Sequence, residues 1–95
     1  MKLQNKTISQ YYENFLDNKD SIVLIDVRTN QEYQDYHLEG ALNIQLEEID
    51  NYKINKNKIV YLYCRSGRRS AIAEEIYKSQ GYKAINIGGI IDFLK

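Results

Sequence analysis

Three short, predominantly apolar runs constrain the fold more than any other feature of this sequence. They are residues 22–25 (IVLI), residues 58–64 (KIVYLYC) and residues 83–87 (KAINI). A strand with one solvated face alternates apolar and polar residues, whereas a continuous run is typical of a strand buried on both faces. The run at residues 58–64 is the clearest of the three, because it is rich in β-branched and aromatic residues.

Segments with helical spacing separate these runs. Residues 7–20 place apolar side chains at helical spacing, and residues 29–37 are expected to form a short helix. Both also carry residues near their start that commonly cap helices. The candidate caps are Thr7 or Ser9 in the first segment and Thr29 or Asn30 in the second.

The second half of the chain continues the alternation. Weaker patterns predict a strand at residues 41–44 and a helix at residues 45–52. A helix that ends at Gly81 is then predicted from the apolar stripe Ile72, Ala73, Ile76 and Tyr77. We expect Gly88 and Gly89 to break the last strand before one or two closing helical turns. Strands that alternate with helices predict an α/β fold, with a small parallel β-sheet flanked by helices on both faces.

Length and composition predict one soluble globular domain over residues 1–95. The chain is 43% hydrophobic and 27% charged, as is ordinary for such a domain. Its formal net charge is zero, which argues against a general polyanion binder, so no nucleic-acid partner is expected. No apolar run approaches the roughly 20 residues needed to cross a bilayer, so no membrane partner is expected either. We expect a monomer.

The cysteine count and the N-terminus predict a reducing compartment. One cysteine excludes an internal disulfide and a cysteine-rich metal site. No other group resembles a metal site, so neither a metal nor another cofactor is expected. The opening residues MKLQNKTISQ contain no apolar h-region of a secretory signal. These observations predict a cytoplasmic protein, in which a lone thiol stays reduced.

The heptapeptide CRSGRRS at residues 64–70 is the strongest functional signal. It places three of the four arginines of the chain within five residues of the only cysteine. It joins a buried strand to a helix N-terminus, where unpaired N–H groups favour anions, and Gly67 allows the curl that turns such groups inward. We therefore expect Cys64 to lie at the mouth of an anion-binding loop as an activated nucleophile with a lowered pKa. The alternative is an inert core cysteine.

Three features follow the ends of predicted strands and are expected to meet. They are Asp26 with Arg28, Cys64 with its arginines, and the pair Gly88 and Gly89. Open α/β sheets bind ligands beyond the carboxyl ends of their strands. The sequence therefore predicts one functional rim.

Four segments of the chain together resemble the rhodanese family. CRSGRRS is similar to its active-site loop, Cys-x-x-Gly-x-Arg, matched by Cys64, Gly67 and Arg69. LIDVRTNQEY resembles its Asp-Val-Arg segment with a downstream Glu-Tyr, while HLEGALNI and INIGGI resemble two further segments. The likeness covers nearly the whole chain, with the four segments in the family order. It implies a rhodanese-like fold.

The resemblance also implies a thiosulfate sulfurtransferase. The thiolate of Cys64 would take a sulfane sulfur from a small anionic donor such as thiosulfate. The resulting persulfide would pass that sulfur to cyanide or to a thiol, including a protein thiol. Related phosphatases need Cys-x₅-Arg, whereas Arg69 makes this loop Cys-x₄-Arg, which favours sulfur transfer. The alternative is a binding or sulfur-sensing module without turnover.

Roles for the loop and its supports complete the hypothesis. The expected substrate-binding residues are Arg65, Ser66, Gly67, Arg68 and Arg69. Among them, Arg65 and Arg68 are expected to meet the donor anion, and Arg69 to lock the loop by pairing with Glu32 or Asp26. The alternatives are that Arg69 only solvates the end of the helix, and that Arg65 and Arg68 are surface charges without a role in binding.

Support from outside the arginine cluster is also expected. Ser66 and Ser70 are interpreted as helix caps. Asp26 and Arg28 are expected to form a structural bracket under the loop, since a charge at the end of a buried strand needs a partner. The only histidine, His37, is interpreted as a loop residue bonded to backbone rather than as an acid–base catalyst.

Overall fold

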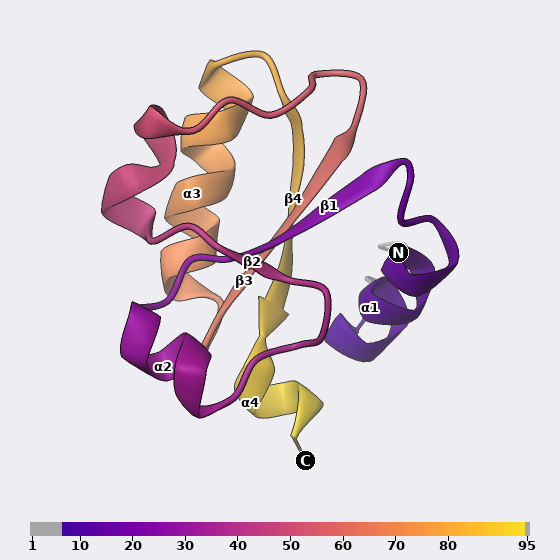
Figure 1. Cartoon of the computed structure of the whole chain (residues 1–95), viewed down its shortest axis with the longest axis vertical. Coiled ribbons are helices and arrows are strands. Elements are labelled where there is room, and N and C mark those ends of the chain that lie inside the picture. The colour runs from indigo at the N-terminus through magenta and orange to yellow at the C-terminus, as the bar shows by residue number, and fades with distance from the viewer. Residues whose placement is uncertain (1–6, 95) are drawn as a thin grey trace, which may run out of the picture.

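A four-stranded parallel sheet organises the chain in the order β2-β1-β3-β4 (Figure 1). The computed structural model describes residues 7–94. The elements in chain order are α1 (Ile8–Asp17), β1 (Ile22–Asp26), α2 (Asn30–Asp35), β2 (Leu42–Asn43), the 3₁₀ helix η1 (Leu46–Asn51), β3 (Ile59–Cys64), α3 (Arg68–Ser79), β4 (Lys83–Gly89) and α4 (Ile90–Phe93). Each of the three apolar runs forms a strand, and the expected α/β architecture is confirmed.

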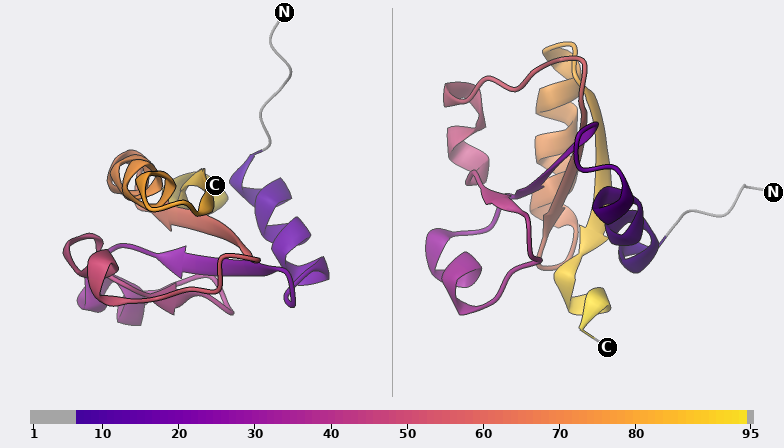
Figure 2. Two further views of the ribbon diagram at one scale, coloured as in Figure 1. Left: turned by 90° about the horizontal axis from the view of Figure 1, so that it is seen from above. Right: turned by 45° about the vertical axis from the view of Figure 1, so that its right-hand side comes forward.

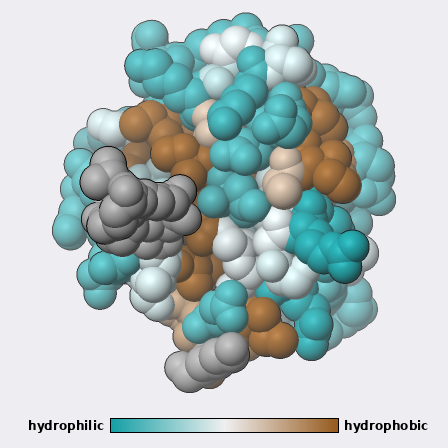
Figure 3. Space-filling view, turned by 180° about the vertical axis from the view of Figure 1, so that it is seen from behind, coloured by the Kyte–Doolittle hydropathy of each residue, from teal (hydrophilic) through white to brown (hydrophobic). Residues whose placement is uncertain are grey.

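Helices cover both faces of the sheet (Figure 2). One core cluster contains Ala73 and Tyr77 of α3 together with Ile49 of η1, packed on one face. The other contains Ile8 and Phe15 of α1, packed on the opposite face. Burial on both sides explains the continuous apolar runs of β1 and β3. From behind, the apolar side chains visible at the surface lie in separate patches among hydrophilic ones (Figure 3).

The carboxyl ends of β1, β3 and β4 meet at one rim. Asp26 pairs in register with Tyr63, Tyr63 with Gly88, and Cys64 with Gly89. The three features expected to converge therefore lie side by side, and this prediction is confirmed.

The predicted helix ends follow the expected capping chemistry. Thr7 and Thr29 are the N-caps of α1 and α2, and each forms a capping box with the residue three positions later. Gly81 follows the end of α3 with a φ of +91°, a left-handed conformation that favours glycine. Within residues 7–94, no helix is both long and apolar enough to span a membrane.

Two details differ from the sequence predictions. β4 does not break before the glycines but continues through Gly88 and Gly89, because a bulge opposite Leu62 and Tyr63 absorbs one extra residue. Gly88 adopts a φ of +119° there. Ile72 was expected on the buried stripe of α3, yet it is 54% exposed. The helix buries instead the face made by Ser70, Ala73 and Tyr77.

Candidate active site

The loop after β3 curls around the sulfur of Cys64. Gly67 caps α3 with a φ of +97°, a left-handed conformation that explains the glycine. The backbone N–H of Gly67 donates to Cys64 Sγ at 3.0 Å, and the N–H of Ser70 donates at 3.4 Å. The predicted inward-facing N–H groups are therefore present, and they point at the sulfur itself.

Cys64 lies deeper than the sequence predicted. Its residue is 0% exposed, so it forms the floor of the loop rather than the mouth. The reason is its place as the last residue of β3, paired with Gly89 and packed in the core cluster of α3. A reactant can reach the sulfur only if the loop or its side chains give way.

The pKa of the Cys64 thiol is lowered, as expected. Burial is the largest influence and raises the pKa, but hydrogen bonds from the Ser70 side chain and from the N–H groups of Ser70, Gly67 and Ser66 outweigh it. Arg69 also attracts the sulfur, since Cys64 contributes to the raised pKa of the Arg69 guanidinium. Hydrogen bonds to the sulfur are therefore the main cause of the stabilisation of the thiolate.

The two loop serines do not cap α3, which corrects their predicted role. The N-cap is Gly67, and no side-chain hydrogen bond caps this helix. Ser66 is exposed, whereas Ser70 is buried. The Ser70 hydroxyl lies 3.4 Å from Cys64 Sγ and 2.7 Å from Asn86 Oδ1. Because Ser70 stands one turn before Ala73 on the buried face of α3, its hydroxyl points into the protein rather than to a helix end.

Arg69 locks the loop to α2, as predicted. Its guanidinium donates to both carboxylate oxygens of Glu32, at 2.8 and 3.0 Å. Of the two partners considered from the sequence, Glu32 rather than Asp26 makes this pair. Glu32 also accepts from the backbone N–H of Thr29, so one carboxylate caps α2 and holds the loop. The Arg69 bond, with Thr29 assisting and burial opposing, lowers the pKa of Glu32 to about 2.

Glu32→Gln is expected to lower the melting temperature at neutral pH and to weaken its decline in acid. The folded pKa of about 2 lies below the ordinary value of 4.5, so this carboxylate stabilises the fold fully above pH 4.5. That contribution is lost as the pH falls towards 2. Thermal unfolding across this range measures the effect, and Arg69→Ala should mimic it without adding to it in the double variant. Parallel decline of parent and Glu32→Gln in acid would show that the pair does not stabilise the fold.

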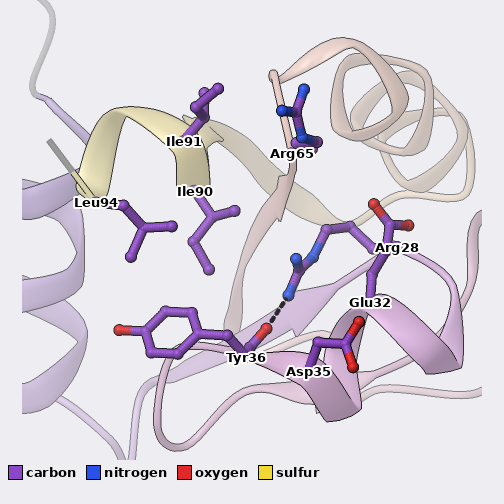
Figure 4. A pocket seen from close by; sticks show the side chains of 8 residues that line it. All are labelled: Arg28, Glu32, Asp35, Tyr36, Arg65, Ile90, Ile91 and Leu94. Atoms are coloured by element: carbon purple, nitrogen blue, oxygen red, sulfur yellow. Dashed lines mark hydrogen bonds between the residues drawn. The ribbon is translucent and has the colours of Figure 1, made fainter.

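Asp26 and Arg28 form a buried ion pair beside the loop. Arg28 Nη2 lies 2.7 Å from Asp26 Oδ2, and Arg28 Nε lies 3.0 Å from Asp26 Oδ1. Arg28 Nη2 also donates to the carbonyl oxygen of Tyr36 at 2.5 Å (Figure 4), and its guanidinium lies over the ring of Tyr63. The predicted bracket is therefore present. It fastens the end of β1 to the segment after α2 and to β3.

His37 is a loop residue bonded to backbone, as predicted, and its partner lies in α2. Its Nδ1 lies 2.7 Å from the carbonyl oxygen of Tyr33, and the two rings stack with their centres 3.7 Å apart. Within residues 7–94, no three His, Cys, Asp or Glu side chains gather as a metal site would require.

Two residues of β4 support the loop. Gly89 was expected at this rim from the sequence, whereas Asn86 was not singled out. A Cβ on Gly89 would stand 2.3 Å from the carbonyl oxygen of Arg65 and 2.7 Å from the backbone of Ser66, so only glycine fits. Asn86 donates from Nδ2 to the carbonyl oxygen of Gly67 at 3.0 Å and accepts from Ser70 at Oδ1. The motif INIGG contains both residues, but only the sheet register places them against the loop.

A cavity of about 230 Å³ lies on the rim beside the loop (Figure 4). Arg65 lines it together with apolar side chains of α4, Ile90 and Ile91. Arg65 and Arg68 are both exposed, and Arg68 begins α3. The structure thus leaves these two arginines available to solvent, while Arg69 is occupied by Glu32.

Comparisons with known proteins agree with this geometry. The family model for the Rhodanese-like domain matches residues 8–94. Thiosulfate sulfurtransferase PspE of Escherichia coli (strain K12) is 41% identical over 73 residues, covering 72% of this chain and 70% of that protein. Thiosulfate sulfurtransferase GlpE of Coxiella burnetii is 33% identical over 75 residues, covering 75% and 70%. The chain spans 39% of the length of another relative, YrkF of Bacillus subtilis.

Solved structures show the same fold. A rhodanese-like domain protein from Staphylococcus aureus superposes with a TM-score of 0.79 at 32% identity, covering 93% of this chain and 88% of that one. A rhodanese with anions from E. coli superposes with a TM-score of 0.69 at 40% identity, covering 76% and 91%. Sequence, fold and loop geometry lead to the same conclusion, that this chain belongs to the rhodanese-like domain family.

Proposed function

We propose that this protein is a sulfurtransferase that carries a sulfane sulfur on Cys64 from a donor such as thiosulfate to cyanide or a thiol. The observation that carries the proposal is the convergence of hydrogen-bond donors on one buried sulfur, with the N–H of Gly67 at 3.0 Å. Donors aimed at a thiol favour its ionised, nucleophilic form. The names of PspE and GlpE, both thiosulfate sulfurtransferases, support the same reaction.

The proposed reaction has two displacements at sulfur. The Cys64 thiolate attacks the outer sulfur of thiosulfate, a new S–S bond forms, and sulfite leaves with the electron pair of the old one. The acceptor then attacks the outer sulfur of the persulfide, and the Cys64 thiolate is the leaving group. Both steps benefit from a thiolate stabilised by fixed donors, because it serves as nucleophile in one and as leaving group in the other.

The position of Arg69 favours sulfur transfer over phosphate chemistry. Phosphoryl transfer needs positive charge directed at the phosphate oxygens. Both terminal nitrogens of the Arg69 guanidinium donate to the Glu32 carboxylate. The donors that remain at the ring converge on Cys64 Sγ itself, which suits a sulfur atom carried on that cysteine.

Intact mass measurement after exposure to thiosulfate tests the proposal. A gain of one sulfur atom is expected, localised to Cys64 and removed again by cyanide or a small thiol. Failure to gain sulfur would contradict the proposal. A sulfur that is gained but never released to any acceptor would instead support the alternative, a sulfur-sensing module without turnover.

Arg65→Ala and Arg68→Ala are expected to raise the KM for thiosulfate by about tenfold each. A charge-assisted contact is worth roughly 1.5–3 kcal/mol, and exposure to water places these two at the lower end, near the 1.4 kcal/mol that corresponds to tenfold. Added salt should raise the KM of the parent more than that of either variant, because it screens the charge they lack. Steady-state kinetics measures both effects.

Lys78→Ala is the matched control for this experiment. Lys78 is an exposed cation in the last turn of α3, paired with Glu74 at 3.6 Å. Removing it changes the net charge equally but leaves the loop untouched, so the KM should stay near that of the parent. An equal rise in all three variants would mean that general attraction, rather than contact at the loop, brings the donor in.

A further inference from the structure

One hydroxyl group lies between two acceptors in the floor of the site. Ser70 Oγ is 2.7 Å from Asn86 Oδ1 and 3.4 Å from Cys64 Sγ. A serine hydroxyl carries one proton, so it can donate to only one of them at a time. The carboxamide oxygen can only accept, and a thiolate can only accept as well. The two groups therefore need the same proton.

Two further hydrogen bonds fix the orientation of the Asn86 carboxamide. Its Oδ1 accepts from the backbone N–H of Gly88 at 3.0 Å, and its Nδ2 donates to the carbonyl oxygen of Gly67 at 3.0 Å. Reversing the amide would place a donor against the N–H and an acceptor against the carbonyl. These two bonds hold Oδ1 towards the hydroxyl of Ser70, which is buried in α3.

We propose that Asn86 is a positioning residue that competes with the Cys64 sulfur for the single hydroxyl proton of Ser70. While Cys64 is a thiol, the hydroxyl donates to Asn86 over the shorter distance, and the Ser70 oxygen can accept from the S–H. When Cys64 becomes a thiolate, the O–H rotates towards the sulfur, and Asn86 Oδ1 keeps the N–H of Gly88. No proton is transferred in this step, since only the O–H direction changes.

The consequence for turnover rests on the proposed function. Sγ is an anion before attack on the donor, a neutral bridging sulfur in the persulfide, and an anion again after release. The hydroxyl would be drawn to Sγ in the first and last states and held by Asn86 in the middle one. Asn86 thus limits how strongly the thiolate is stabilised. A less stabilised thiolate is a stronger nucleophile in the first step, and a more stabilised one is a better leaving group in the second.

Neighbouring charges do not produce the same pattern. Arg69 of α3 attracts both Cys64 and Asp26 of β1, and Asp26 is itself paired with Arg28. Glu74 of α3 accepts from the backbone N–H of Asn86 and pairs with Lys78. These groups are unchanged by replacement of either the Ser70 hydroxyl or the Asn86 side chain. They contribute equally to all four proteins compared below.

The rate of Cys64 alkylation by iodoacetamide against pH tests the competition in four proteins. They are the parent, Ser70→Ala, Asn86→Leu and the double variant. Ser70→Ala should raise the pKa of Cys64 by about one unit, a tenfold loss of thiolate, because a donor to the sulfur is removed. Asn86→Leu should lower the pKa of Cys64 by about half a unit relative to the parent, because the Ser70 hydroxyl then has only the sulfur to donate to. In the Ser70→Ala background, the same substitution should not produce this lowering.

The comparison between backgrounds separates positioning from simple support. Loss of the bond from Asn86 Nδ2 to Gly67 loosens the loop in both backgrounds and therefore cancels. An Asn86→Leu shift that is the same with and without Ser70 would overturn the proposal and leave Asn86 as a support of the loop. The assay needs no sulfur transfer, so a protein that fails as a sulfurtransferase can still pass it, and an active one can fail it.

A second measurement leaves Asn86 in place, in case Asn86→Leu does not fold. The ¹³C resonance of the Asn86 carboxamide should titrate with Cys64 in the parent, because Oδ1 loses the hydroxyl as the thiolate forms. In Ser70→Ala the response should be much smaller, since no hydroxyl group is there to turn from one acceptor to the other. A carboxamide resonance that responds equally in both proteins would contradict the competition.

Discussion

Cys64→Ser is expected to reduce sulfur transfer from thiosulfate to cyanide to background while the fold is retained. A serine hydroxyl in this loop is not ionised at neutral pH and cannot form a persulfide, so the proposed intermediate is lost completely. The substituted oxygen is smaller than sulfur, and it can accept from the N–H of Gly67 that now donates to Sγ. Colorimetric detection of thiocyanate measures the activity, and thermal unfolding measures the fold.

Cys64→Ala provides the control for packing. It removes the same atom without adding a hydroxyl to a fully buried position. Both variants should be inactive and keep a cooperative unfolding transition. Turnover by folded Cys64→Ser comparable to the parent would exclude Cys64 as the sulfur carrier.

Gly89→Ala is expected to lower kcat/KM by about a hundredfold or more. Gly89 has an ordinary φ of −113°, so alanine causes no backbone strain there. The cost is steric, because the new Cβ would stand 2.3 Å from the carbonyl oxygen of Arg65 and 2.7 Å from the Cα of Ser66. These are backbone atoms of the loop, and displacing the loop by about 1 Å is enough for such a loss.

The loop shift should also appear without turnover. The carbonyl oxygen of Arg65 accepts from the N–H of Ile91, so the same displacement pulls the loop from α4. The N–H of Gly67 would no longer point at Cys64 Sγ, and the pKa of the thiol should rise. Iodoacetamide alkylation at neutral pH should therefore slow.

Gly81→Ala is the matched control for glycine replacement. Gly81 lies beyond the C-terminal end of α3 with a φ of +91°, and its Cβ would meet only Lys56 Nζ, at 3.4 Å. Alanine there should destabilise the protein by roughly 1–2 kcal/mol through backbone strain. Its activity below the melting transition should match the parent. If the two variants lose activity in proportion to stability alone, the contact of Gly89 with the loop has no specific role.

Local pattern was sufficient to predict most elements of the fold. The apolar runs became β1, β3 and β4 because both faces of the sheet are covered. Thr7 and Thr29 cap helices because a side-chain oxygen and an N–H three residues away satisfy each other without distant help. The curl at Gly67 is equally local, since it depends on one residue that can adopt a positive φ.

The sequence predicted two possible partners for Arg69, and the tertiary structure shows which of them makes the pair. Asp26 ends β1 and Glu32 lies in α2, and both are carboxylates. Their charge therefore does not show which of them pairs with Arg69. Asp26 is buried and held by Arg28, whereas Glu32 stands at the start of α2 facing the loop. Which carboxylate remains available depends on where α2 packs.

The sequence by itself determined the order of elements, the caps of α1 and α2 and the reactive loop, because each depends on residues a few positions apart. Only the tertiary structure decided how that loop is supported. Cys64 is buried at its floor, Gly89 lies against its backbone, and the Ser70 hydroxyl lies between Cys64 and Asn86. These contacts join residues as many as 24 positions apart and depend on the register between β3 and β4. A one-residue bulge in that pairing sets which side chains of β4 face the loop, and no local pattern encodes its position.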